Sequence, residues 1–148
     1  MFRHQILLLL ALILAVSALH ADLEIQIKNT QQTVKLTAII LQERNYISLD
    51  DINAALGSIT QVEYADFRIY LYLWGEQFVF LPEAAYYYFK NDVYSMHFPL
   101  LANGAVYCLP ESFLLEQLPR HFPDQVTRKG RKLEVLKPKD KRVQRIVL

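Results

Sequence analysis

Apolar and polar residues alternate with a period of two near the start of the chain, a pattern that predicts half-buried strands. Leu23, Ile25 and Ile27 alternate with polar residues, and residues 33–40 form a second, β-branched segment. Turn-forming residues at 29–32 separate the two segments. We therefore expect a hairpin here.

The spacing then changes to that of a helix. Leu49, Ile52 and Leu56 recur at intervals of three and four residues, which places them on one helical face. Ser48 is positioned to cap the N-terminus of this helix, and Gly57 suits its end. The pattern predicts an amphipathic helix of about two turns that lies on a sheet.

A long apolar strand is predicted over residues 62–74. Ile69 and Leu71 lie on one of its faces, and Tyr70, Tyr72 and Trp74 lie on the other. Because both faces are apolar, we expect both to be covered.

Further strands follow in the middle of the chain. A short strand is predicted over residues 77–81, and residues 84–89 and 93–98 flank a Lys90-Asn91-Asp92 turn. A helix over residues 83–90 is the alternative, although the run of Tyr and Phe favours a strand.

A second strand-to-helix unit begins at Gly104. Residues 104–110 lead into an apolar helical pattern over residues 111–118, which Pro119 is expected to end. A shift of 62 residues aligns this unit with residues 47–57. The sequence thus predicts an α+β, β-rich domain of two strand–hairpin–short-helix–strand repeats that share a sheet.

The N-terminus has the parts of a secretory signal peptide. Arg3 lies in a polar start, residues 6–16 are an unbroken apolar run, and small residues lead to Ala21. The run is shorter than the ~20 residues that cross a bilayer. We expect residues 1–21 to be removed and the remainder to be exported, to the periplasm or the cell wall. A buried hydrophobic helix and an uncleaved membrane tether are the alternatives.

Charge is distributed unevenly along the rest of the chain. Residues 22–127 hold 6 basic and 13 acidic residues (net −7), whereas residues 128–148 hold 9 basic and 2 acidic residues (net +7). A basic tail of this kind favours anionic wall polymers, lipids or nucleic acid, and export makes nucleic acid the least expected of these. The plain alternative is a solvated strand pair and a linker.

The supply of reactive side chains is small. His97 and His121 are isolated in the sequence beyond residue 21, and Cys108, the one cysteine, lies in an apolar strand pattern that predicts a buried thiol. No serine lies in a G-x-S-x-G elbow. We expect no catalytic residue, no metal site and no cofactor in this chain.

Tyr70, Tyr72 and Trp74 are the binding candidate. Residues two apart on a strand lie about 7 Å from each other on one face, and aromatic rings at that spacing could stack on sugar rings. The alternative is that these side chains pack beneath a helix or a second sheet.

The strand-to-helix segments at residues 45–57 and 104–118, with the turn at residues 90–92 and Phe98-Pro99, resemble the copper amine oxidase N-terminal-like domain. The likeness covers about residues 22–137. It implies a non-catalytic stalk or wall-associated module of an exported protein, without copper ligands.

The C-terminal residues point to a second resemblance. Residues 138–148 comprise a charged linker and an apolar strand, Val143 to Leu148, which is similar to the first strand of a zinc-dependent N-acetylmuramoyl-L-alanine amidase domain. That likeness implies a missing C-terminal enzyme, in which any zinc would be bound. The chain is then an accessory domain that helps to place a cell-wall hydrolase at peptidoglycan or on another envelope protein, with membrane contact only through the signal peptide. A last edge strand of this same domain is the alternative for residues 143–148, and a self-sufficient glycan- or protein-binding module is the alternative function.

Overall fold

The computed structural model describes residues 3, 5, 6 and 22–139. Three sheets and two short helical segments make up residues 22–139, so the predicted β-rich, α+β class is confirmed. The strands are β1 (Leu23–Ile27), β2 (Gln32–Leu36), β3 (Ile39–Leu41), β4 (Arg44–Ser48), β5 (Ile59–Glu63), β6 (Arg68–Leu73), β7 (Glu76–Phe80), β8 (Tyr86–Phe89), β9 (Asp92–Ser95), β10 (Leu101–Asn103), β11 (Val106–Pro110), β12 (Val126–Lys129) and β13 (Lys132–Val135). The helical elements are α2 (Leu49–Leu56), the π-helix η1 (Phe113–Gln117) and α3 (Leu118–His121).

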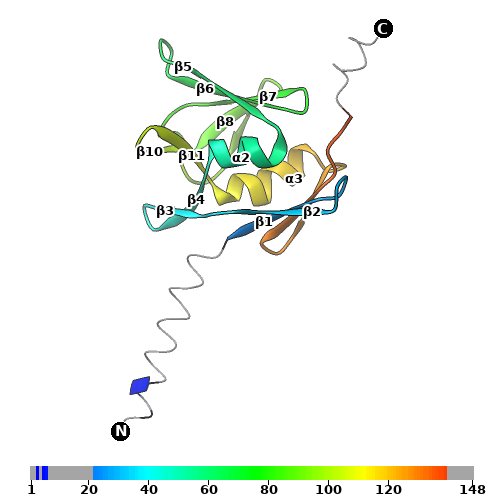
Figure 1. The fold of residues 1–148 in the computed structure, drawn as a ribbon. Coiled ribbons are helices and arrows are strands. Elements are labelled where there is room, and N and C mark those ends of the chain that lie inside the picture. The colour runs from blue at the N-terminus through cyan, green and yellow to red at the C-terminus, as the bar shows by residue number, and fades with distance from the viewer. Residues whose placement is uncertain (1–2, 4, 7–21, 140–148) are drawn as a thin grey trace.

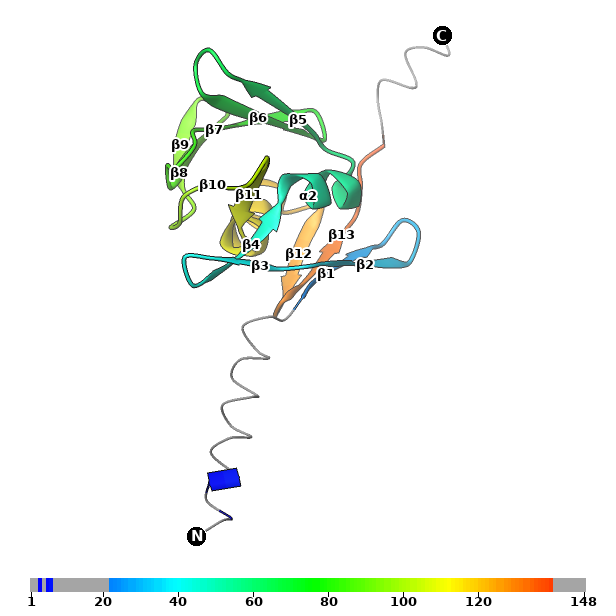
Figure 2. The ribbon, with the colours of Figure 1, turned by 60° about the vertical axis from the view of Figure 1, so that its left-hand side comes forward.

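The sheets surround the helices. Sheet A has the order β12-β13-β1-β2, sheet B the order β10-β11-β4-β3 and sheet C the order β5-β6-β7-β8-β9. Figures 1 and 2 show sheet C on one side of the helices and sheet A on the other. One apolar core, which draws residues from all three sheets and from the helices, fills the space between them.

Helix α2 begins and ends where the sequence predicts. The Ser48 side chain accepts a hydrogen bond of 3.1 Å from the backbone N–H of Asp51, which satisfies one of the free donors at the helix N-terminus. Gly57 ends the helix with a φ of 73°, in the left-handed region that favours glycine. The apolar face carrying Ile52 is buried.

The second helical segment is longer than predicted. Helical residues run from Glu111 to His121, past Pro119, so the expectation that Pro119 ends the helix is wrong. The N–H of Leu118 bonds to the carbonyl of Phe113, five residues earlier, and the turn is therefore of the π type. Pro119 then lies in the first turn of α3, where an N–H is not needed.

Two predicted strands are each divided in the structure. The segment 33–40 becomes β2 in sheet A and β3 in sheet B. The segment 62–74 belongs to a hairpin of β5 and β6, whose turn includes Phe67 at a φ of 52°. A hydrophobic period of two continues through the first division, and Phe67 extends the period of β6 into the second, so periodicity alone does not reveal these turns.

The two ends of the described domain meet in sheet A. Strand β1 pairs in parallel with β13, the last strand of residues 22–139. Beyond β13, the N–H of Lys137 donates to Asn29 Oδ1 at 2.7 Å, and Asn29 Nδ2 donates to the Lys137 carbonyl at 3.1 Å. The predicted strand at residues 143–148 and most of the predicted signal peptide lie outside the described residues.

Replacing Ser48 by Ala is expected to lower the free energy of unfolding by about 1 kcal/mol, because the Asp51 N–H loses its partner at the N-terminus of α2. Denaturant unfolding measures this change. Ser48→Thr retains the hydroxyl and is the control. Equal stability of the Ala variant and the parent protein would contradict the assigned role of the cap.

Candidate functional site

The inner face of sheet C is sealed by aromatic rings. Phe78 of β7 stacks on Phe89 of β8 with ring centroids 4.6 Å apart, and it meets the edge of Phe113 from η1 at 5.3 Å. Phe80 meets Phe113 at 5.2 Å. Since these side chains are at most 4% exposed, the inner face holds the helices and is closed to ligands.

A buried polar group lies within this aromatic layer. Tyr87 donates to Gln117 Oε1 at 3.0 Å, and its hydroxyl lies 2.6 Å from Nε2 of His121. Burial lowers the pKa of His121 to about 4, and the cations Arg120 and Lys90 act in the same direction. His121 is therefore neutral at pH 7. Burial also raises the pKa of the Tyr87 hydroxyl above its usual range, so neither group titrates near neutrality.

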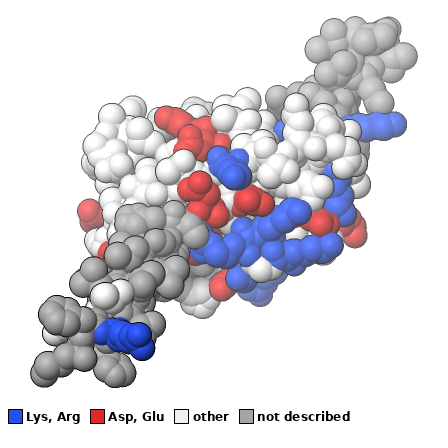
Figure 3. All heavy atoms as spheres, turned by 60° about the horizontal axis from the view of Figure 1, so that its bottom comes forward, with Lys and Arg blue, Asp and Glu red and all other residues white. Residues whose placement is uncertain are grey.

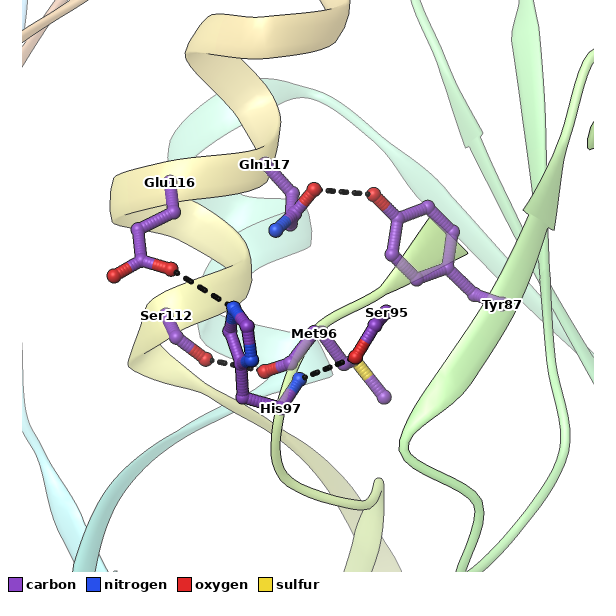
Figure 4. A network of polar contacts seen from close by, with 7 residues as sticks. All are labelled: Tyr87, Ser95, Met96, His97, Ser112, Glu116 and Gln117. Atoms are coloured by element: carbon purple, nitrogen blue, oxygen red, sulfur yellow. Dashed lines mark hydrogen bonds and ion pairs between the residues drawn. The ribbon is translucent and has the colours of Figure 1, made fainter. Parts of the chain in front are cut away.

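Further polar contacts fix the helical segment against the end of sheet C (Figure 4). Ser112 donates to the carbonyl of Met96 at 2.8 Å. His97 Nε2 lies 3.7 Å from a carboxylate oxygen of Glu116, at an exposed position. These contacts have a structural explanation, which is that they orient η1 on the sheet.

The outer face of sheet C is exposed and rich in tyrosine. Tyr72 is 39% exposed, Tyr86 45% and Tyr88 39%, and Tyr70 is half-buried. Val79 of β7 lies opposite both Tyr70 of β6 and Tyr88 of β8. We call these side chains of β6, β7 and β8 the tyrosine face: Tyr70, Tyr72, Val79, Tyr86 and Tyr88. The expectation that both faces of this segment are covered is wrong for residues 22–139.

Tyr70 and Tyr72 lie side by side, as their spacing in the sequence predicts. Their ring centroids are 6.4 Å apart and their planes differ by 16°. The Tyr70 hydroxyl donates to Glu63 on the neighbouring strand at 3.1 Å, which holds the ring over the sheet. Interaction with Tyr70 in turn raises the pKa of Arg68. The two nearly parallel rings thus form an apolar pair, with Glu63 and Arg68 beside the Tyr70 hydroxyl.

Trp74 lies elsewhere. It occupies the turn between β6 and β7 with a φ of 51°, and Gly75 follows with a φ of 81°. This left-handed pair, typical of two-residue hairpin loops, ends the alternation of the strand. The Trp74 ring packs edge-on against Phe122, 5.0 Å between centroids. Its Nε1 is buried, with no hydrogen-bond partner among the described residues.

Tyr86 and Tyr88 belong to the tyrosine face but are not among the residues predicted from the sequence. The run Tyr86 to Phe89 gives no apolar–polar contrast, because every member is aromatic. Alternation within the predicted strand is the available signal, since Tyr87 and Phe89 are buried while Tyr86 and Tyr88 are exposed.

The tyrosine face contains a hollow along β7. Its volume is 580 Å³, and its lining includes Gln77, Val79, Tyr88, Arg68 and Lys90. Of the tyrosine face, Val79 and Tyr88 line this hollow, whereas Tyr70, Tyr72 and Tyr86 lie outside it. The lining combines apolar surface with a few hydrogen-bonding groups, as in many ligand sites.

A second hollow, of 690 Å³, lies between sheet B and the start of the second helical segment. Its charged groups are largely engaged with neighbours. Arg131 forms a forked ion pair with Glu111 at 2.7 and 2.9 Å, and the Arg44 guanidinium lies 3.8 Å above the Phe98 ring centre. The tyrosine face exposes the rings of Tyr72, Tyr86 and Tyr88 and is therefore the better candidate.

The described residues include few side chains that could act in catalysis or bind a metal ion. Cys108 is buried, as the sequence predicts, and burial raises the pKa of its thiol, which disfavours the reactive thiolate. Residues 22–139 hold no cluster of three His, Cys, Asp or Glu side chains with the geometry of a metal site. Within the described part of the chain no helix is long and apolar enough to span a bilayer.

Comparisons of this chain with known protein families, curated proteins and solved structures find no match. The resemblances stated from the sequence therefore stay predictions, and function is argued from the face itself.

The half-buried His121 predicts a pH-dependent stability. Its pKa is about 4 in the folded state and about 6.5 when unfolded, so the unfolded chain binds the proton more tightly. Stability is complete above pH 6.5 and falls as the pH approaches 4, by about 3 kcal/mol from this group.

Denaturant unfolding from pH 7 to pH 4 measures the loss, with His121→Gln as the comparison because Gln cannot gain this charge. The variant should show a shallower pH dependence than the parent. Identical pH profiles would show that His121 is not buried in the neutral form.

Proposed function

We propose that this chain is a non-catalytic glycan-binding domain, exported and attached to a cell-wall hydrolase, and that the tyrosine face contacts peptidoglycan. The observation that supports the proposal is the set of tyrosines on β6 and β8, which flank Val79 of β7 on one face of sheet C and of which three are exposed. Apolar surface of this kind is unusual on a free sheet face and marks an interaction site.

The shape and chemistry of the face suit a sugar chain. The nearly parallel rings of Tyr70 and Tyr72 offer apolar surface to the C–H face of a sugar ring. Tyr86 and Tyr88 lie on the far side of β7, with ring planes at 86° to each other. A sugar chain that crosses β7 would thus contact aromatic rings of both β6 and β8.

The polar groups around the hollow suit hydroxyl and amide substituents. Gln77 and Asn91 line the hollow and can both donate and accept hydrogen bonds, and Arg68 and Lys90 supply donors. The phenolic hydroxyls add groups of both kinds at low conformational cost. A ligand with apolar faces and polar edges would pack against the aromatic rings and also form hydrogen bonds with these polar groups.

The remaining parts of the proposal come from the sequence. Export depends on the signal-peptide pattern of residues 1–21, and attachment to an amidase depends on the resemblance of residues 143–148. The two-repeat origin of the domain is likewise a proposal. If the domain acts alone, the same face would serve a self-sufficient exported binding module.

The double replacement Tyr72→Ala and Tyr88→Ala is expected to reduce retention on purified, insoluble peptidoglycan by about tenfold or more, because each exposed ring contributes on the order of 1 kcal/mol when it stacks. A sedimentation assay with increasing peptidoglycan measures the change. Both side chains are exposed, so the fold should persist, and thermal unfolding checks that it does.

The matched control is Tyr64→Ala with Phe67→Ala, which removes two exposed rings from the β5–β6 turn. This control should bind like the parent protein. Absence of retention by the parent protein would refute the glycan proposal, and so would equal losses in the two double variants.

Attachment to an amidase has its own test, which is the DNA that follows codon 148. The resemblance predicts an Asp-x-Gly-His-Gly-Gly segment within a few codons. A stop codon at that position would contradict the accessory role while leaving the glycan proposal intact.

A further inference from the structure

The outer face of sheet A is basic, in contrast to the body that carries it. Side chains alternate along its strands, and the inward set, such as Ile25 and Leu133, is fully buried. The outward set includes a row across all four strands, in which Lys129 pairs with Lys132, Lys132 with Glu24, and Glu24 with Lys35. Figure 3 shows Lys and Arg side chains gathered on this side of the molecule.

The carboxylates on this face neutralise only part of its charge. Glu134 lies 3.1 Å from Lys28 and 3.0 Å from Lys129, and its hydrogen bonds to Lys129 and Lys28 lower the pKa of its carboxyl group. The outward positions of sheet A hold four lysines and two glutamates, a net of +2. We call Lys28, Lys35, Lys129 and Lys132 the lysine face.

We propose that the lysine face binds the surface of a bilayer that contains anionic phospholipids. The shape of the face supports this partner, because the four lysines project from an open sheet and line neither of the two hollows described above. Lysine is a compact point charge suited to a diffuse layer of headgroups. Juxtamembrane basic groups are attracted to such a layer at close range.

A free phosphate compound or a nucleic acid suits this face less well. Recognition of a discrete phosphate commonly uses the forked donors of arginine. In this region Arg131 already holds Glu111 in a forked pair. The lysine face also lacks exposed aromatic side chains on which bases could stack.

The two proposed surfaces lie on opposite sides of the helices, since sheet A and sheet C flank them (Figure 1). A bilayer on sheet A would leave the tyrosine face free to contact peptidoglycan. The inference nevertheless stands on the lysines alone and does not depend on glycan binding.

The test is sedimentation with vesicles of phosphatidylglycerol and phosphatidylcholine (3:7), and with phosphatidylcholine alone. The protein used is the chain from Asp22 to Leu148, which includes all three sheets and the core. We expect binding to the anionic vesicles alone, and its loss in 0.5 M NaCl. The variant Lys35→Gln with Lys132→Gln should partition at least about tenfold less, because each charge near the surface is worth about fivefold.

The matched control is Arg68→Gln with Lys90→Gln, which removes the same charge from sheet C and should bind almost normally. Lys35 and Lys132 form no ion pair with another described residue, so their replacement should leave the fold intact, as thermal unfolding can verify. Absence of binding to anionic vesicles would overturn the proposal. Equal binding by the two double variants would also overturn it, because basic residues outside the lysine face would then account for the binding. Retention of soluble polyphosphate without retention on vesicles would assign the lysine face to a different ligand and would refute the proposal that it binds a membrane.

Discussion

The packing of Phe78 against Phe89 of β8 and Phe113 of the second helical segment determines which face of sheet C is exposed. This contact attaches one side of a five-stranded sheet to the helices, with rings 4.6 to 5.3 Å apart. Because side chains on a strand alternate, burial of Phe78 and Phe80 commits Gln77 and Val79 to the opposite side. The tyrosine face is therefore a consequence of the core beneath it.

The arrangement of sheets A and C gives the domain two chemically different exposed sides. Aromatic rings dominate the outer surface of sheet C, and lysines dominate that of sheet A. The parallel pairing of β1 with β13 places the basic segment after residue 127 beside the start of the domain. The charge asymmetry of the sequence thus becomes a spatial asymmetry, in which one side suits an anionic surface and the other suits a neutral polar polymer.

Local signals in the sequence predicted much of this fold. Helix α2 followed from Ser48, its apolar spacing and Gly57, each of which acts within a few residues. The assignment of Tyr70 and Tyr72 to one face also followed from local spacing. The turn at Phe67 was missed because it places a bulky aromatic residue at positive φ, where glycine or asparagine is usual. The turn between the strands predicted at residues 62–74 and 77–81 is present, but Trp74 belongs to that turn and not to the strand. The exposure of the tyrosine face could not be predicted, because it depends on which side of sheet C the helices cover, and that is a long-range contact.

The central claim is that the outer surface of sheet C, and not the hollow beside Arg44, is where the domain meets glycan. Titration of the isotopically labelled protein with soluble peptidoglycan fragments, followed by nuclear magnetic resonance, tests it directly. The account predicts shift changes that are largest for Tyr70, Tyr72, Tyr86 and Tyr88 and small around Arg44 and Glu111. Changes centred on Arg44 and Glu111, or no changes at saturating fragment, would contradict it.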